Sequence, residues 1–204
     1  MTTRRKIAPP NLLIAPKMYD WRYQEQLNNA NRLFFASVAN QANASVPYGS
    51  FACATTLTNP VASGINLVPF DTQLGGVYNT TIGRENSRLY VAETGIYNIQ
   101  FSAQANVSAG GGTDKITLWL RKNGENYPAT AGKVIVNGPN SETMAAWNYV
   151  LPLKVADYIE LAWSSPETHM ILQAEDAIDT IPSIPSVILT IVWVSYANNS
   201  TGLS

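Results

Sequence analysis

A run of alternating apolar and polar residues at positions 96–105 constrains the fold of this chain more than any other feature. Its apolar members are Tyr97, Ile99, Phe101, Ala103 and Ala105, and its polar members are Asn98, Gln100, Ser102 and Gln104. Successive side chains of a β-strand point to opposite faces, so this period of two predicts a strand with one face in a hydrophobic core. Residues 115–122 alternate in the same way and predict a second such strand.

The chain from Pro47 onward consists of short segments of this kind, separated by turn signals such as Gly75-Gly76 and Asn123-Gly124. Further strands are predicted at 48–57, 65–70, 87–92, 143–151, 158–163, 169–174 and 187–196. Only 13% of the residues are charged, well below the usual share of about a quarter, so neutral polar residues cover much of the surface. About nine short strands with no helix between them predict a mainly β domain, an antiparallel sandwich, at residues 47–204.

The first 46 residues follow a different pattern and are predicted to form a separate anchor arm and helix. Three prolines keep residues 7–18 extended, because proline fixes its own φ and disfavours helix in the residue before it. Leu12, Leu13 and Ile14 lie between these prolines. Such a segment has no core of its own, so we expect its apolar side chains to lie in a groove on another surface.

A single short helix is predicted from Asp20 to residue 42, because this stretch lacks glycine and proline and Asp20 is a good N-cap. Tyr23, Leu27, Ala30 and Phe34 recur at helical spacing and form an apolar stripe. Two heptads are marginal as a free coiled coil. The stripe is therefore expected either to pack on the chain's own domain or to act as an anchor or oligomerisation helix.

The last predicted strand, residues 187–196, is apolar on both faces. One face carries Val187, Leu189, Ile191 and Trp193, and the other carries Ile188, Val192 and Val194. A strand that is apolar on both sides is covered on both sides. One face belongs to the core, and the other is expected to be covered by an identical subunit or by the chain's own N-terminal arm.

The charge of the chain is nearly balanced overall but uneven along its length. The net charge of −1 argues against a general nucleic-acid binder. Residues 1–46 hold six basic and two acidic residues. Residues 141–204 hold one basic and seven acidic residues. A basic arm suits an acidic docking surface, with chance and solvation as the alternative. No apolar run is long enough to predict a membrane span, and prolines interrupt any secretion signal.

Side chains that could carry catalysis or bind a metal are few. Cys53 is the only cysteine, which excludes an internal disulfide framework and a cysteine-based zinc site, and its alanine neighbours predict an inert buried thiol. His169 is the only histidine and is expected to be a partly buried strand residue. Glu175, Asp176 and Asp179 form an acidic cluster suited to solvent or to calcium. We therefore expect no enzyme activity, no cofactor and no transition-metal centre.

Four segments of the β domain resemble strands of the complement/tumour-necrosis-factor jelly roll. Residues 95–101 look like the G-x-Y-x-(apolar)-x-F strand of that family, and residues 118–124 are similar to the strand and turn that follow it. Residues 155–161 resemble its G-D-x-(apolar)-x-L strand entry, although Ala156 stands where glycine is usual. Residues 185–190 resemble the closing strand of phage members of the group. The resemblance implies a jelly-roll sandwich.

The N-terminal arm carries a second likeness. Residues 15–20 followed by residues 23–35 resemble the proline, tyrosine and Leu/Phe-helix anchor at the start of small tailed-phage virion fibres. The two likenesses together span about residues 9–196. They imply a structural protein at the surface of a phage virion, a trimeric fibre or spike that is docked by its arm and displays a jelly-roll knob.

The expected partners are two further copies of the chain, capsid, connector or tail proteins of the particle, and a host surface glycan. The residues expected to anchor the arm are Leu12, Leu13, Ile14, Pro16, Tyr19, Tyr23, Leu27 and Phe34. Those expected at the trimer contact are Ile188, Val192 and Val194, with Asn98 and Gln100 facing the three-fold axis as the resemblance implies. Trp119 fits either a subunit contact or a sugar-stacking platform.

Three alternatives remain open. One is a capsid decoration, or cement, protein, and a second is a free carbohydrate-binding module of the lectin kind. The third, a glycan-cleaving enzyme, needs a pair of acids in a groove, and no such pair is visible in the sequence.

Overall fold

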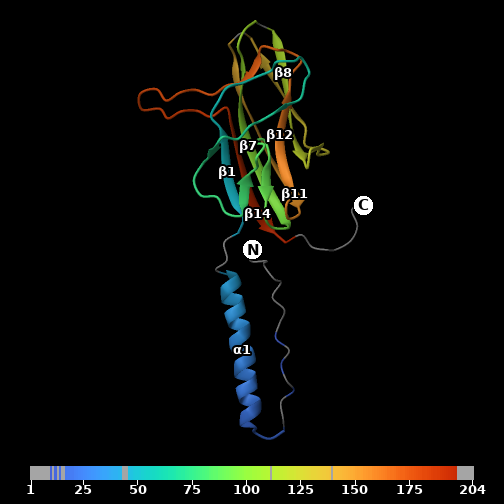
Figure 1. Ribbon diagram of the computed structural model, residues 1–204, viewed down its shortest axis with the longest axis vertical. Coiled ribbons are helices and arrows are strands. Elements are labelled where there is room, and N and C mark those ends of the chain that lie inside the picture. The colour runs from blue at the N-terminus through green and yellow to red at the C-terminus, as the bar shows by residue number, and fades with distance from the viewer. Residues whose placement is uncertain are drawn as a thin grey trace. The chain divides into compact units, whose positions relative to one another are not determined.

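The computed structural model of the protein describes residues 10, 12, 14, 17–42, 46–110, 112–138 and 140–196 (Figure 1). The chain divides into two compact units between Ser45 and Val46, one residue from the boundary that the sequence indicates. Each unit is described below by itself.

The N-terminal unit contains one helix, α1, which runs from Trp21 to Ala42. Asp20 caps it as predicted, because the Asp20 Oδ1 atom accepts a hydrogen bond of 2.9 Å from the backbone N–H of Arg22. The four residues of the predicted apolar stripe, Tyr23, Leu27, Ala30 and Phe34, are all half-buried. Other large apolar side chains of α1, such as Leu33 and Phe35, are exposed.

The second unit is an antiparallel sandwich of two seven-stranded sheets, which confirms the predicted mainly β class. Sheet A has the order β2 (Leu57–Thr58), β13 (Met170–Leu172), β7 (Gly95–Val107), β14 (Val187–Ser195), β1 (Tyr48–Cys53) and β4 (Thr72–Gln73), with β11 (Glu142–Leu153) on the other side of β7. Sheet B has the order β10 (Gly132–Asn137), β8 (Thr113–Lys122), β12 (Tyr158–Ser164), β6 (Leu89–Val91) and β5 (Thr80–Ile82), with β3 (Asn66–Leu67) on β12 and β9 (Glu125–Asn126) on β8.

The core lies between the inner faces of the two sheets. The apolar members of the alternating run on β7, from Tyr97 to Ala105, are all buried, as the period of two predicts. Sheet B contributes the alternate residues Leu118 and Leu120 of β8 and Trp163 of β12. The inner face of β14 is buried as well, so this strand closes the core beside β7.

Five short strands were not predicted from the sequence: β2, β4, β5, β9 and β10. Four of them have only two or three residues, too few to show a period. The fifth, β10, pairs along its full length with β8 at the edge of sheet B. In the opposite direction, the predicted strand at 48–57 stops at Cys53, because the next backbone N–H, that of Ala54, donates to the Asp71 carboxylate instead of a neighbouring strand.

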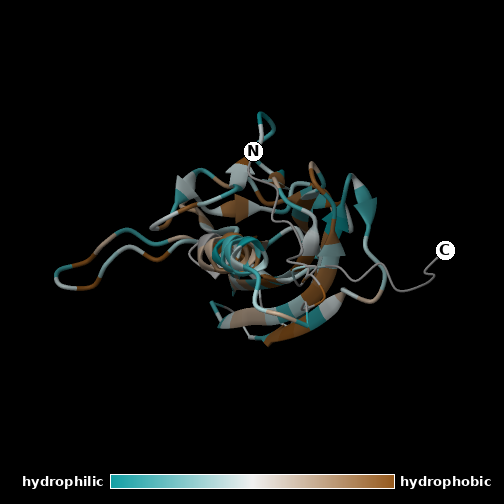
Figure 2. Ribbon diagram, turned by 90° about the horizontal axis from the view of Figure 1, so that it is seen from below, coloured by the Kyte–Doolittle hydropathy of each residue, from teal (hydrophilic) through white to brown (hydrophobic). Residues whose placement is uncertain are grey.

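A long hairpin extends away from the sheets between β13 and β14, and we call residues 174–185 the hairpin arm (Figures 1 and 2). Two pairs of backbone hydrogen bonds close it, one between Glu175 and Ile184 and one between Ile178 and Ile181. Asp179 takes a positive φ of 53° at its tip. Ile178 and Ile181 are 61% and 60% exposed, so the hairpin arm carries exposed apolar side chains.

Candidate functional site

The outer face of sheet A brings together most of the residues that the sequence assigns to a trimer contact. On this face β7 runs between β11 and β14, and the register places their outward side chains in cross-strand rows. One row contains Val150, Asn98 and Val192, and the next contains Asn148, Gln100 and Thr190. A polar central strand is therefore flanked by partly apolar ones.

The apolar side chains of this face are exposed although the core behind them is complete. Val150 is 64% exposed, and Val192, Val194 and Met144 are also exposed. The central Asn98 differs, because its Oδ1 atom is buried and has no hydrogen-bond partner among the described residues. A buried amide oxygen without a partner is costly, so a donor from a second molecule would stabilise this row.

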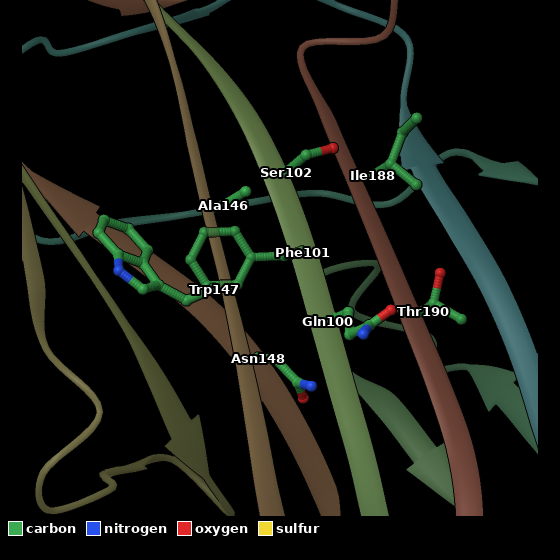
Figure 3. A pocket seen from close by; sticks show the side chains of 8 residues that line it. All are labelled: Gln100, Phe101, Ser102, Ala146, Trp147, Asn148, Ile188 and Thr190. Carbon is green, nitrogen blue, oxygen red and sulfur yellow. The ribbon is translucent and has the colours of Figure 1, made fainter.

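A hollow of about 420 Å³ lies near the middle of the face (Figure 3). The side chains of Gln100, Asn148 and Thr190 line it, as do the small side chains of Ser102 and Ala146. Ile188 of β14 also lines it, together with Phe101 of β7 and Trp147 of β11. The surface is hollowed at Ser102 and Ala146, because these two residues are cross-strand neighbours on β7 and β11 and both have small side chains. A side chain of a partner can therefore enter between the two flanking strands.

The structure places Asn98, Gln100, Ile188 and Val192 on this single face, as the alternation of β7 and β14 predicts. Val194 follows them, at an irregularity of the β7–β14 pairing between Trp193 and Ser195. The contact itself stays a prediction.

Sequence reasoning missed the contribution of β11. Met144 and Val150 lie on the same outer face, in register with Gln104 and Asn98. The sequence of residues 143–151 does not show which side chains face outward, because apolar residues occupy both alternating sets of positions.

The residues assigned to the anchor lie in the N-terminal unit. Leu12, Ile14 and Tyr19 are exposed, and Ile14 is 95% exposed. Tyr23, Leu27 and Phe34 lie along the half-buried stripe of α1. Leu13 and Pro16 lie outside the described residues. Exposed apolar side chains are suited to docking, and the role of this group stays a prediction.

Trp119 lies on the outer face of sheet B. Its indole N–H donates a hydrogen bond of 2.8 Å to Asn126 Oδ1, which fixes the ring beside a hollow of about 380 Å³. Tyr127, Ala129 and Ala131 also line this hollow. A half-buried indole that is held by its own hydrogen bond is suited to stacking on a sugar as well as to a subunit contact.

Two groups of charged residues stabilise sheet B. Glu160 is 2% exposed, and its carboxylate accepts from Arg121, while the Arg88 guanidinium lies 3.5 Å away. Asp157 is held by Lys122 Nζ at 2.9 Å and by hydrogen bonds from Asn123 and the Lys154 N–H. Burial alone would raise the pKa of the Asp157 carboxyl, but these donors outweigh it and the pKa lies below its ordinary value.

Two tyrosines with buried or half-buried rings donate hydrogen bonds to backbone carbonyls. The pKa of Tyr97 is raised above its usual range, mainly because the phenol is buried, and its hydroxyl donates to the carbonyl of Glu93 at 2.7 Å. Burial likewise raises the pKa of Tyr149, whose hydroxyl donates to the carbonyl of Thr130. Both rings therefore act as structural donors at neutral pH.

The remaining reactive side chains are placed as follows. Cys53 is fully buried at the end of β1. His169 lies one residue before β13, in the loop that follows β12, with its Nε2 atom 3.2 Å from Asp114 Oδ1. Asp176 and Asp179 are exposed in the hairpin arm, and no metal-binding group forms there among the described residues.

Comparison with protein-family models found no match, and comparison with curated proteins found none either. Among the described residues, no helix is both long and apolar enough to cross a lipid bilayer.

Proposed function

We propose that this chain is a structural protein of a virus particle of the tailed-phage kind, attached through residues 1–46 and displaying the sandwich at the particle surface as a trimer. The observation that carries the proposal is the outer face of sheet A. Its exposed valines and the buried, unpartnered Asn98 Oδ1 atom are suited to cover by a second copy of the chain.

The order of the strands supports a jelly roll for the displayed domain. Sheet A contains the neighbours β1, β14, β7 and β11, and sheet B contains β10, β8, β12 and β6. The chain passes from one sheet to the other at eight connections, which are β2–β3, β3–β4, β4–β5, β6–β7, β7–β8, β10–β11, β11–β12 and β12–β13. Repeated crossing between two antiparallel sheets is the arrangement that a jelly roll requires.

The exposed apolar residues of the N-terminal unit support attachment through the arm. Ile14, Met18 and Tyr19 are more than four-fifths exposed, which is unfavourable in water unless a partner covers them. The prolines of this segment predict an extended backbone, and such a backbone loses little entropy on docking. Whether the displayed domain acts as a fibre or as a cement protein depends on the site to which this arm docks.

Trp119 supports a second activity of the displayed domain, recognition of a host surface glycan. The hollow beside the indole is lined by Tyr127 and by two alanines, a small apolar platform with a polar Asn126 at its edge. Sugar rings stack on such platforms through their apolar faces. The same features would serve a free lectin-like module.

The proposal is tested by deleting residues 1–46 and measuring incorporation into purified particles by mass spectrometry. We expect a folded domain, by circular dichroism, that is missing from the particles. The chain with residues 1–46 retained and carrying Asp176→Asn serves as the control, because this exposed residue of the hairpin arm lies outside the proposed contacts and the variant should be incorporated normally. Incorporation of the truncated protein at normal copy number would show that the sandwich itself makes the attachment.

A further inference from the structure

We propose that Asp114, Glu167 and His169 form a binding site for one divalent transition-metal ion, Zn²⁺, at one end of the sandwich. Asp114 is the second residue of β8 in sheet B, and Glu167 and His169 lie in the loop that leads from β12 to β13 of sheet A. A metal held by these three side chains would connect the two sheets at the end of the core. This inference does not depend on the proposed function.

The distances between the three side chains are close to those of a metal site. One potential ligand atom from each residue lies within 4.8 Å of the other two. His169 Nε2 and Asp114 Oδ1 are 3.2 Å apart. In a tetrahedral zinc site with bonds of about 2.0–2.1 Å, ligand atoms lie roughly 3.3 Å from one another. The histidine and the aspartate already have this separation, and a rotation of the flexible Glu167 side chain can bring in the third ligand.

The burial of Asp114 is the second observation that points to a ligand. Asp114 is 6% exposed and continues the inward-facing row of Ile116, Leu118 and Leu120 on β8. Its Oδ2 atom is buried and accepts no hydrogen bond from any described residue. A buried carboxylate oxygen is unfavourable unless a cation or a hydrogen-bond donor compensates it. The contact between Oδ1 and His169 Nε2 leaves this second oxygen without compensation.

The backbone around the other two ligands is held in place before any metal binds. The carbonyl of His169 accepts hydrogen bonds from the Ser108 N–H at 3.0 Å and from the Ser108 hydroxyl at 2.8 Å. The carbonyl of Glu167 accepts a hydrogen bond of 3.0 Å from Asn59 Nδ2, and the backbone N–H of Glu167 donates to Ser165 Oγ. Ligands on a fixed backbone lose little entropy on binding a metal, which favours affinity.

The donor set selects the ion. An imidazole nitrogen with two carboxylates suits zinc, whereas calcium and magnesium prefer sites made of oxygen alone. The two carboxylates neutralise the charge of the ion, and water can complete the fourth position. The sequence expectation of no transition-metal centre rests on the single histidine, the single cysteine and the absence of a ligand cluster in the sequence. A site of this composition needs only one histidine, and its ligands come together only in the fold.

The test uses the full-length protein, treated with a chelator and then titrated with ZnCl₂. We expect one saturable Zn²⁺ per chain by calorimetry and by elemental analysis after gel filtration. At a hundredfold excess over Kd, the Tm should rise by about 5–10 °C. CaCl₂ at the same concentration should leave the Tm unchanged. The absence of saturable Zn²⁺ binding up to 100 μM, or an equal response to calcium, would overturn the proposal.

Variants assign the binding to the three residues. Asp114→Asn and His169→Gln should each lower the affinity for Zn²⁺ at least tenfold, and Glu167→Gln should lower it less. Asp176→Asn, which removes an exposed carboxylate of the hairpin arm, is the matched control and should bind as the wild type does. His169→Gln carries the test if Asp114→Asn does not fold, because His169 is only half-buried. Undiminished affinity in His169→Gln would contradict the site.

Discussion

The indole of Trp193 on β14 packs directly over the Cα atom of Gly95, the first residue of β7. A Cβ atom built on Gly95 would lie 2.6 Å from Trp193 Cδ1 and 2.8 Å from the carbonyl oxygen of Ser195. Only glycine fits this position without a shift of the neighbouring strand. The contact explains why a glycine opens the strand motif at residues 95–101, and it couples the start of β7 to the end of β14.

Gly95→Ala should therefore destabilise the sandwich. The added methyl group meets backbone as well as the ring, so the strand must move, and we expect a loss of about 1–3 kcal/mol in the free energy of unfolding. Urea denaturation followed by tryptophan fluorescence measures it. Gly112→Ala is the control, because nothing lies within 4 Å of a Cβ atom there, and its effect should be below about 0.5 kcal/mol. Equal stability of the two variants would refute the steric explanation.

The Asp157 carboxylate should make the stability depend on pH in the acid range. Its pKa is lower in the folded protein than in the unfolded chain, so its contribution is present above the ordinary value of 3.8 and is lost as the pH falls through the folded value. Asp157→Asn should cost about 1–3 kcal/mol at pH 7, because hydrogen bonds to a charged group are lost. The difference from wild type should shrink as the pH falls below about 4.

Chemical denaturation at several pH values between 2 and 7 measures this difference. Asp176→Asn, in the exposed hairpin arm, should follow the wild-type curve throughout. A gap between wild type and Asp157→Asn that stays constant down to pH 2 would show that the ionised carboxylate is not its source.

The buried carboxylate of Glu160 should contribute far more to stability than the exposed carboxylate of Glu85, although both contact Arg88. Glu160→Gln keeps the shape but leaves Arg121 and Arg88 without their shared anion, and we expect a loss of about 1–3 kcal/mol. Glu85→Gln removes the ion pair between Arg88 and the Glu85 side chain, which is 58% exposed. This substitution should lower the free energy of unfolding by less than about 1 kcal/mol. Thermal unfolding of both variants gives the comparison. A larger loss in Glu85→Gln would reverse our assignment of the stabilising pair.

Much of the sandwich could be predicted because its long strands have one buried face. The run on β7 shows a period of two that local sequence alone reveals, and Asp20 marks the start of α1 by its capping chemistry. The strand β10 could not be found in this way, since Val134, Ile135 and Val136 are apolar in succession and show no period of two. For the hairpin arm the sequence indicates only an acidic loop, because its isoleucines follow neither a strand nor a helix period.

The cluster of Asp114, Glu167 and His169 shows a different limit. Asp114 is 53 residues from Glu167 in the sequence, and no spacing rule connects them. Only the packing of β8 against the loop before β13 brings the carboxylates to the imidazole. The alternation of β8 does indicate that Asp114 points inward with Ile116. A charged residue in an inward position is therefore a signal that the sequence contains and that we did not use.

The outer face of sheet A should determine the assembly of the protein. Sedimentation equilibrium of residues 47–204 at micromolar concentration should give a mass of three chains, because the exposed valines and the buried oxygen of Asn98 are covered in a trimer. Val192→Glu in the full-length chain places a charge among apolar neighbours, and should raise the dissociation constant at least a hundredfold, which corresponds to about 3 kcal/mol. Val155→Glu, equally drastic but in the exposed turn between β11 and β12, should assemble normally. A stable monomer of residues 47–204, or a Val192→Glu variant that still forms trimers, would exclude this face as the contact.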